Sequence, residues 1–400
     1  MNLKKRNIIS AVIAAVMAVS FFYILHRIEN LNTKTIDCVN VGFIYDGDAS
    51  TPYSANFINA AKQLSAFYGD KVDIVEEHNV PDEDCEEVID KFAEKGCHII
   101  FTNSYGYQET AKKMSEKYPD IEFCAATGDN SDSNHPNYHT FMGEIYQGRY
   151  VSGIIAGLKL KEEINKGIIS EKQAVVGYVA AYSCPEVISG YTAFLLGVRS
   201  QCPNATMRVR YIDTWNNFSL EKETAEKLIS EGCVIISHHT NTIGSALACE
   251  EADRPYPVYH IGYNQDMMSI APTVSLTSTR IDWSPYFISA VEAVMQHKDI
   301  EKCTEGIING NDVSGGFREG WVKILDINNA AAAPGSRKLI KKAVEDMSAG
   351  KIHVFKGKYK GTDPNDPNDT CDLSTEYMEN ASSSAPTFHY ILSDIITIET

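Results

Sequence analysis

The sequence lacks the short motifs that mark many enzymes and metal centres. None of its ten cysteines forms a C-x-x-C pair, so neither a zinc cluster nor thioredoxin-like redox chemistry is indicated. It contains no G-x-S-x-G, no H-E-x-x-H and no P-loop. Its acidic residues are concentrated on predicted helix faces such as 82–95, where solvation is their usual role. We therefore expect a protein that is not an enzyme and that uses no cofactor.

Positive charge is also scarce in the chain, because 36 lysine and arginine residues stand against 53 aspartate and glutamate residues. The formal net charge is −17, which argues against binding to a phosphate backbone, and no zinc-finger spacing is present. We therefore do not expect nucleic acid as a binding partner. The composition, 44% hydrophobic and 22% charged, is that of an ordinary globular protein, and 400 residues are typical of two domains.

The N-terminal segment differs from the rest. Three basic residues, 4–6, precede an uncharged apolar run from Ile8 to Leu25. This run fits a secretory signal or one membrane-spanning helix, and an uncleaved anchor is favoured because signal cores are shorter, at about 7–15 residues. Positive charge before the run predicts that the remainder lies outside the cytoplasm, attached to the cell membrane or secreted after cleavage. The first cysteine, Cys38, is too distant to be the lipidated residue of a lipoprotein.

Several cysteines lie within or beside apolar runs. Cys97, Cys124 and Cys233 have strand-like apolar neighbours, where cysteine behaves as a small buried hydrophobic residue. We expect mainly free buried thiols. The sequence also allows one or two disulfide bridges, because an exported chain experiences oxidising conditions.

One pattern occurs twice, about 136 residues apart. The segments EKGCHIIFTNS (94–104) and EGCVIISHHTN (231–241) have the same form. Upstream of them, VGFIY at 41–45 and VGYVA at 176–180 are each followed by a helix-like stretch, a strand and a second helix that ends in glycine. Each half therefore predicts β-α-β-α-β, with strands apolar enough to be buried on both faces.

Strands that alternate with helices predict a doubly wound parallel sheet, so two such halves predict a two-domain α/β protein. Ligands of these sheets bind at the carboxyl ends of the strands. The polar segments 102–107 and 237–242 are equivalent strand ends, and we expect them to face each other across a cleft. The segment after Gly357 is rich in Asp, Pro and Asn and is predicted to be a surface loop.

These segments also carry a family resemblance. The chain resembles the basic membrane protein family, the purine-nucleoside-receptor-type substrate-binding proteins with a type I periplasmic-binding fold. Seven segments match in the family's order: VGFIYDG (41–47), IIFTNSYGYQETAKKMSEKYPDIEF (99–123), GEIYQGRYVSGIIAG (143–157), VVGYVAAYSCPEVISGYTAFLLGVRS (175–200), DTWNNFSLEKETAEKLISEGCVII (213–236), IGYNQDM (261–267) and LTSTRIDWSPYF (276–287).

The resemblance implies a two-lobed clamshell. Lobe 1 is expected to comprise 37–143 with about 273–300, and lobe 2 to comprise 144–272 with about 301–356. Residues 1–36 form the signal or anchor segment, and 357–400 a loop-rich tail. The implied function is capture of a purine nucleobase or nucleoside by hinge closure, for delivery to the permease of an ABC importer. The alternative is the extracellular ligand-sensing part of a signalling system without a transport role.

Nine residues are candidate ligand contacts. The resemblance implies that Tyr53, at the start of the first helix, stacks on a planar base; packing in the core is its alternative. The sequence leaves two roles for Trp215 and Trp283, which are stacking on a ligand and packing between domains. Ser104 and Tyr105 follow a strand, where Ser104 can also cap the next turn.

The remaining candidates are polar. Glu186 can accept a hydrogen bond from a base or ribose, or only interact with the dipole of its helix. Asn241 offers both a donor and an acceptor to a base edge. Asn264 stands where the family often has aspartate, with Asp266 two residues later. The adjacent His238 and His239 are not expected to share a metal ion, because neighbouring side chains of a strand point to opposite faces.

Overall fold

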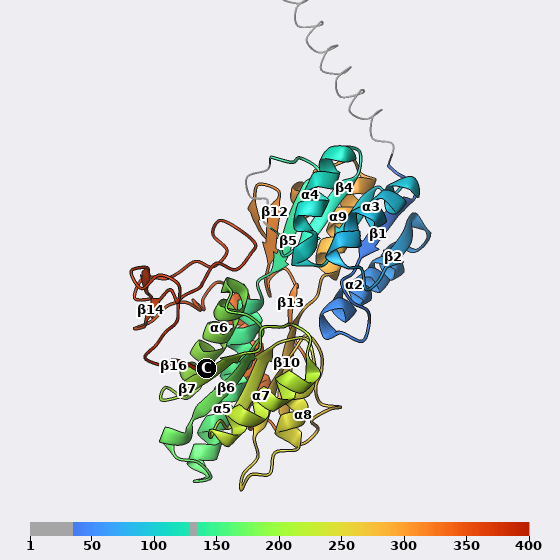
Figure 1. Ribbon diagram of the computed structural model, residues 1–400. Coiled ribbons are helices and arrows are strands. Elements are labelled where there is room, and N and C mark those ends of the chain that lie inside the picture. The colour runs from blue at the N-terminus through green and yellow to red at the C-terminus, as the bar shows by residue number, and fades with distance from the viewer. Residues whose placement is uncertain (1–34, 129–133, 400) are drawn as a thin grey trace, which may run out of the picture.

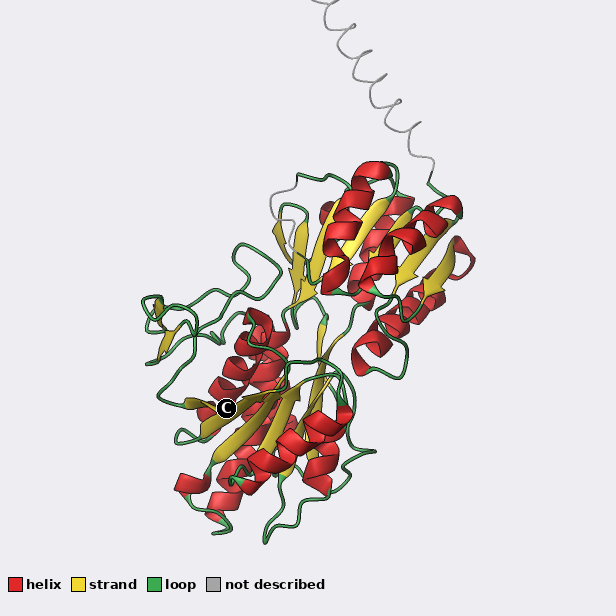
Figure 2. Ribbon diagram, in the orientation of Figure 1, coloured by secondary structure: helices red, strands yellow, loops and turns green. Residues whose placement is uncertain are grey.

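A computed structural model describes residues 35–128 and 134–399, which form two lobes, each built on a seven-stranded sheet (Figure 1). Helices cover both faces of each sheet (Figure 2). The predicted N-terminal helix lies outside the described residues. Within 35–128 and 134–399, none of the helices has the length and apolar character needed to span a membrane.

Lobe 1 holds the first half of the repeated pattern. Its sheet has the order β11-β12-β5-β4-β3-β1-β2, parallel except for the edge strand β11. The strands are β1 (Val39–Ile44), β2 (Val72–Glu77), β3 (Ile99–Thr102), β4 (Glu122–Ala126), β5 (Tyr138–Gly143), β11 (Ile307–Asn309) and β12 (Asp312–Gly315). The helices are α2 (Pro52–Tyr68), α3 (Cys85–Glu94), α4 (Gln108–Lys117), α9 (Ser284–Met295) and α10 (Ile300–Cys303).

Lobe 2 repeats this arrangement. Its sheet has the order β13-β10-β9-β8-β6-β7-β16, with only β13 antiparallel. The strands are β6 (Val175–Ala180), β7 (Thr206–Tyr211), β8 (Ile235–His239), β9 (Tyr259–Tyr263), β10 (Ser275–Ile281), β13 (Val322–Ile324) and β16 (Ile396–Glu399). The helices are α5 (Ile145–Asn165), α6 (Pro185–Gln201), α7 (Phe218–Ser230), α8 (Gly244–Glu250) and α11 (Ser336–Ser348).

The duplicated sequence is thus a duplicated topology. Counted from the first strand of each half, both sheets share the order 2-1-3-4-5, as β2-β1-β3-β4-β5 and β7-β6-β8-β9-β10. The two opening segments supply the equivalent strands β3 and β8. Both are buried along their full length, because helices lie on both faces of the sheet. The predicted doubly wound α/β fold with two lobes is confirmed.

The predicted lobe boundaries differ from those observed. Strand β10 lies in the second sheet although 273–300 was assigned to lobe 1, and β11 and β12 lie in the first sheet although 301–356 was assigned to lobe 2. The chain crosses between lobes at three places: after β5, after β10 and between β12 and β13. At the first two crossings a strand and its following helix belong to different lobes, which a strand-helix sequence pattern does not reveal.

The three crossings are hydrogen-bonded to one another. The backbone N–H of Glu144 donates to the carbonyl of Gly315 at 2.9 Å, and that of Asp282 donates to Trp321 at 2.6 Å. The Glu144 carboxylate also accepts from Ser314 Oγ at 3.1 Å, and burial raises the pKa of Glu144 to about 7. The crossings therefore form one connected hinge rather than three independent linkers.

The C-terminal tail is more ordered than a surface loop. A small hairpin, β14 (Lys360–Thr362) and β15 (Thr370–Asp372), is followed by β16, which pairs with β7. Leu373, Phe388 and Leu392 are buried in the core of lobe 2. The backbone N–H of Ser384 reaches lobe 1 and donates to Asp312 at 2.6 Å. The tail therefore contacts both lobes (Figure 1).

Helices α5 and α6 pack with their backbones unusually close. A Cβ atom at Gly197 would overlap the carbonyl oxygen of Tyr150, and one at Gly153 would overlap that of Phe194. A third glycine, Gly157, faces the carbonyl of Val198 in the same way. Glycine is required at these positions because any side chain would force the two helices apart.

Candidate functional site

A cavity of about 570 Å³ lies between the lobes at the carboxyl ends of both sheets. Lobe 1, lobe 2 and the tail all contribute to its wall. The lining residues are Asp46, Tyr53, Asn103, Ser104, Tyr105, Thr127, Met142, Tyr182, Cys184, Pro185, Glu186, Trp215, Asn216, His239, Asn241, Tyr263, Ala385 and Pro386. The volume falls in the range typical of small-molecule sites, about 300–1,000 Å³.

The lobe 1 wall is a hydrogen-bonded group at the ends of β1 and β3. Asp46 Oδ1 accepts from Asn103 Nδ2 at 2.9 Å and from Ser54 Oγ at 2.8 Å. The Asp46 N–H donates back to Asn103 Oδ1 at 2.9 Å. Tyr53 OH donates to the Asn103 carbonyl at 2.7 Å. These bonds fix the ring of Tyr53 and hold a carboxylate and an amide at the cavity wall.

The lobe 2 wall combines a carboxylate with aromatic rings. Glu186 lies in the first turn of α6, and its Oε1 is 3.3 Å from His239 Nε2. Trp215 packs edge-on against Tyr182 and His239, with ring centroids 5.5 and 6.0 Å apart. The carbonyl of Trp215 accepts from the Asn241 N–H at 2.8 Å, which ties the two cavity residues together.

A buried arginine lies beneath this wall. Arg149 on α5 is fully buried, lies 3.7 Å from the ring centroid of Tyr263, and donates to the His238 carbonyl at 2.9 Å. Burial, followed by the charge of Arg149, lowers the pKa of His239 to about 4, although Glu186 opposes the shift. The imidazole of His239 is therefore neutral at pH 7, with one nitrogen that donates and one that accepts.

The adjacent histidines point to opposite faces of β8. His239 faces the cavity and packs against Tyr263 at 4.8 Å, whereas His238 stacks on His260 at 5.3 Å inside the lobe. The alternation expected for a strand is confirmed. The two rings are not arranged around a common point.

Six of the nine predicted site residues line the cavity: Tyr53, Ser104, Tyr105, Glu186, Trp215 and Asn241. Ser104 also accepts from the Gly106 N–H at 3.2 Å, so it caps the turn as its alternative reading proposed. Tyr105 is 75% exposed and lies at the rim. The cavity thus brings together residues that are 188 positions apart in sequence (from 53 to 241).

The structure does not place the other three at the cavity wall. Trp283 is 1% exposed and stacks on Phe57 at 4.4 Å, because the hinge crossing that precedes α9 turns it into the lobe 1 core. Asn264 adopts a left-handed backbone (φ 65°), and its carbonyl accepts from Asn56 Nδ2 at 3.0 Å, a contact between the lobes. Asp266 accepts from the Met268 N–H at 2.9 Å in a surface turn.

Sequence reasoning missed other cavity residues. Asp46 follows β1 and Asn103 follows β3, so their positions at strand ends were available as signals. His239 lies in the segment 237–242, which was expected to face the cleft, but as an individual residue it was considered only as a metal ligand. Ala385 and Pro386 reach the cavity from the tail, and no local pattern in the sequence indicates this.

The buried histidine gives a pH prediction. The pKa of His239 is lowered from 6.5 to about 4 in the folded state, so the unfolded chain binds the proton first as pH falls. The contribution of the neutral His239 side chain to the free energy of unfolding is complete above pH 6.5 and is lost as the pH falls towards 4. We therefore expect His239→Gln to lose less unfolding free energy than wild type between about pH 7 and about pH 5.

Denaturant unfolding at both pH values measures this difference. The control is His353→Gln, which replaces a histidine whose side chain is 44% exposed. Parallel pH profiles for wild type and His239→Gln would contradict a neutral buried imidazole in the folded protein.

Residues 38–349 match the Bmp family, which is described as the PnrA-like substrate-binding proteins of ABC transporters. The chain belongs to this family. The predicted resemblance is confirmed, and the matched residues include both sheets' repeated strands and all cavity residues except Ala385 and Pro386. Proteins of this family bind solutes for ABC transporters. The tail after 349 lies outside the match.

The chain is also similar to individual known proteins and to solved structures. A purine-binding protein of Brucella abortus is 30% identical over 329 residues, covering 81% of this chain and 85% of that protein. A putative ABC transporter glucose-binding protein of Haloferax volcanii is 32% identical over 211 residues, but covers 53% of this chain and 49% of its own length. An ABC transporter solute-binding protein of Conexibacter woesei has a similar fold, with a TM-score of 0.61 and 19% identity over 79% of this chain and 98% of that one.

Proposed function

We propose that this protein captures a purine nucleobase or nucleoside between its lobes for an ABC importer. One observation carries the proposal: Tyr53 of lobe 1 and Trp215 of lobe 2 both line the same cavity. Aromatic side chains stack on the faces of nucleobases, and each such contact is worth about 1–3 kcal/mol. A flat ring held between two lobes stabilises the closed form relative to the open one.

The polar residues of the cavity suit the edge of a base and a ribose. Asp46 and Glu186 carry carboxylate oxygens that accept from base N–H groups or sugar hydroxyls, and the side-chain amide of Asn241 both donates and accepts. The amide of Asn103 bonds to Asp46 and orients its carboxylate. Aromatic rings together with a few placed polar groups are the usual composition of small-molecule sites. The similarity to the purine-binding protein of Brucella abortus supports this ligand class over the sugar of the shorter Haloferax match.

The hinge gives the mechanism of capture. Ligand contacts from both lobes favour rotation about the three crossings joined at Glu144 and Asp282. The closed form then presents a surface made by both lobes to a permease. The apolar N-terminal segment would hold the lobes outside the cytoplasm, near that partner.

Thermal unfolding of the purified chain against a ligand panel tests the proposal. A ligand that binds only the folded state stabilises it by about 2.7 kcal/mol at a hundredfold excess over Kd. We expect a rise in Tm with adenosine, guanosine, inosine or their bases, and none with glucose, ribose or amino acids. A rise with glucose alone would reject the purine assignment.

A further inference from the structure

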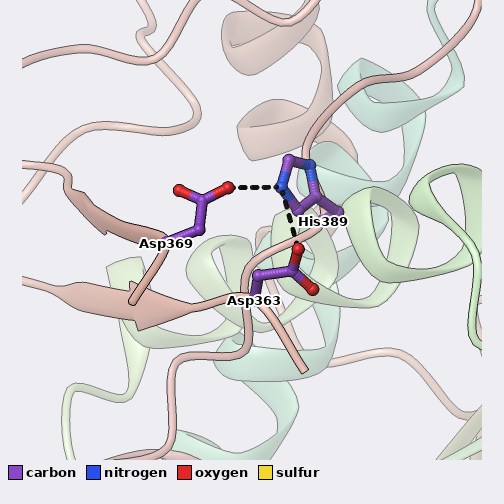
Figure 3. A group of neighbouring side chains, drawn as sticks. All are labelled: Asp363, Asp369 and His389. Atoms are coloured by element: carbon purple, nitrogen blue, oxygen red, sulfur yellow. Dashed lines mark hydrogen bonds and ion pairs between the residues drawn. The ribbon is translucent and has the colours of Figure 1, made fainter. Parts of the chain in front are cut away.

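Three side chains of the C-terminal tail converge on one point (Figure 3). Asp363 and Asp369 lie at the two ends of the loop between β14 and β15, and His389 comes from a separate segment. His389 Nε2 is 3.8 Å from Asp363 Oδ2 and 3.5 Å from Asp369 Oδ2. One atom from each residue lies within 4.8 Å of both others.

The atoms that face away from this point are held by other groups. His389 Nδ1 lies 2.7 Å from the Thr387 carbonyl, which only accepts, so Nδ1 is the donor. Tyr390 OH donates to Asp369 Oδ1 at 3.1 Å. A histidine bonded through Nδ1–H to a carbonyl, and a carboxylate bonded through its second oxygen, are the outer contacts that orient metal ligands.

The inward atoms are two carboxylate oxygens and, in the neutral imidazole, one nitrogen lone pair. Three acceptors therefore face each other, and a cation between them removes their repulsion. We propose that Asp363, Asp369 and His389 bind a divalent transition-metal ion, with Zn²⁺ as the ion to test.

The donor set and spacing favour zinc over other common ions. Imidazole nitrogen and carboxylate oxygen bind Zn²⁺ at about 2.0–2.2 Å, which places neighbouring tetrahedral ligands about 3.4 Å apart. The separations of 3.5 and 3.8 Å from His389 Nε2 need only a small contraction, and the two carboxylate oxygens lie within 4.8 Å of each other. Calcium and magnesium prefer oxygen ligands alone and more of them. The side chains are 17–43% exposed, so an ion can enter and a water can complete the shell.

A bound ion would fix the tail next to the cavity. It would join the β14–β15 loop to His389, four residues after Ala385, which with Pro386 lines the cavity wall. The same segment bonds to Asp312 of lobe 1 through Ser384. This site lies beyond residues 38–349, the segment that matches the Bmp family.

Zinc competition with a chromophoric chelator tests the site directly. The full chain, purified without a histidine tag and stripped of metal, is titrated in the absence of any nucleoside. We expect one Zn²⁺ per chain, with affinity at least about tenfold weaker in His389→Gln and in Asp369→Asn. Zinc should also raise the Tm of wild type but not of these variants, and Mg²⁺ should not compete.

The matched control is His353→Gln. His353 also pairs with one carboxylate of the tail, Glu376 at 2.6 Å, but among residues 35–128 and 134–399 no second carboxylate is grouped with it. The His353→Gln variant should bind zinc with the same affinity as wild type. Circular dichroism of metal-free variants verifies that they fold. Absence of zinc binding in wild type, or undiminished binding in both His389→Gln and Asp369→Asn, would overturn the proposal. Neither result bears on the purine assignment, because no purine is present.

Discussion

Replacing Trp215 with alanine is expected to weaken purine binding by about 5- to 150-fold. This range is the loss of about 1–3 kcal/mol of stacking, converted to an affinity ratio. Trp215 lies at the cavity, is half-buried, and contacts only Tyr182 and His239 among aromatic rings in the described residues. Isothermal titration calorimetry with the purine that gives the largest thermal shift measures the change.

Three companion variants separate stacking from general damage. Tyr53→Phe keeps the ring and removes the hydroxyl that donates to the Asn103 carbonyl, so its loss should be smaller than that of Tyr53→Ala. Phe67→Ala removes an exposed aromatic from the same helix and should leave affinity unchanged. Equal affinities for wild type and Trp215→Ala, with both proteins folded, would rule out Trp215 as a stacking residue.

The variant Gly197→Val is expected to destabilise the protein by about 3 kcal/mol or more. A side chain at 197 overlaps the carbonyl oxygen of Tyr150 on the facing helix, and backbone atoms cannot rotate away as a flexible side chain can. The helices must separate, which opens the α5–α6 contact in the core of lobe 2. Tm should fall by at least about 6 °C, because each kcal/mol corresponds to about 2–4 °C in a domain of this size.

Ser200→Val is the control for this prediction. Ser200 is exposed and lies three positions further along the same helix, so a valine there adds the same side chain without the overlap. Neither substitution has a large cost in helix propensity, and Ser200→Val removes the hydrogen bond from Ser200 Oγ to the Gly197 carbonyl. Its Tm should lie within about 2 °C of wild type, since exposed substitutions usually cost under about 0.5 kcal/mol. Similar Tm values for the two variants would contradict the close packing of α5 and α6.

Much of the fold could be predicted because its signals are local and repeated. The apolar strands at 99–102 and 235–239 and the glycines that precede them are features of short windows, and they recur in both halves. The lobe boundaries could not be predicted in the same way. Whether β10 and α9 share a lobe is decided by the turn at Asp282 and Trp283, where the change of direction depends on contacts with Trp321.

Those cavity residues that lie at the ends of the predicted strands could be predicted from the sequence. Tyr53, Glu186 and Asn241 lie beside the carboxyl ends of β1, β6 and β8, which duplicated sheets place at one cleft. Trp283 and Asn264 lie outside the cavity lining because of neighbours that are distant in sequence: Phe57 stacks on Trp283, and Asn56 bonds to Asn264. The cavity contacts of the tail depend on its bridge to Asp312 and have no local signal.

The most direct test is a titration of tryptophan fluorescence. The chain has three tryptophans, and Trp283 and Trp321 are each 1% exposed in the lobe 1 core, which leaves Trp215 at the cavity. Tryptophan fluorescence is excited at the red edge of the tryptophan absorption band, where purines do not absorb. We expect a saturable change with a purine nucleoside or base, and no such change in Trp215→Phe. No saturable change in wild type with any purine would contradict capture of a purine in this cleft.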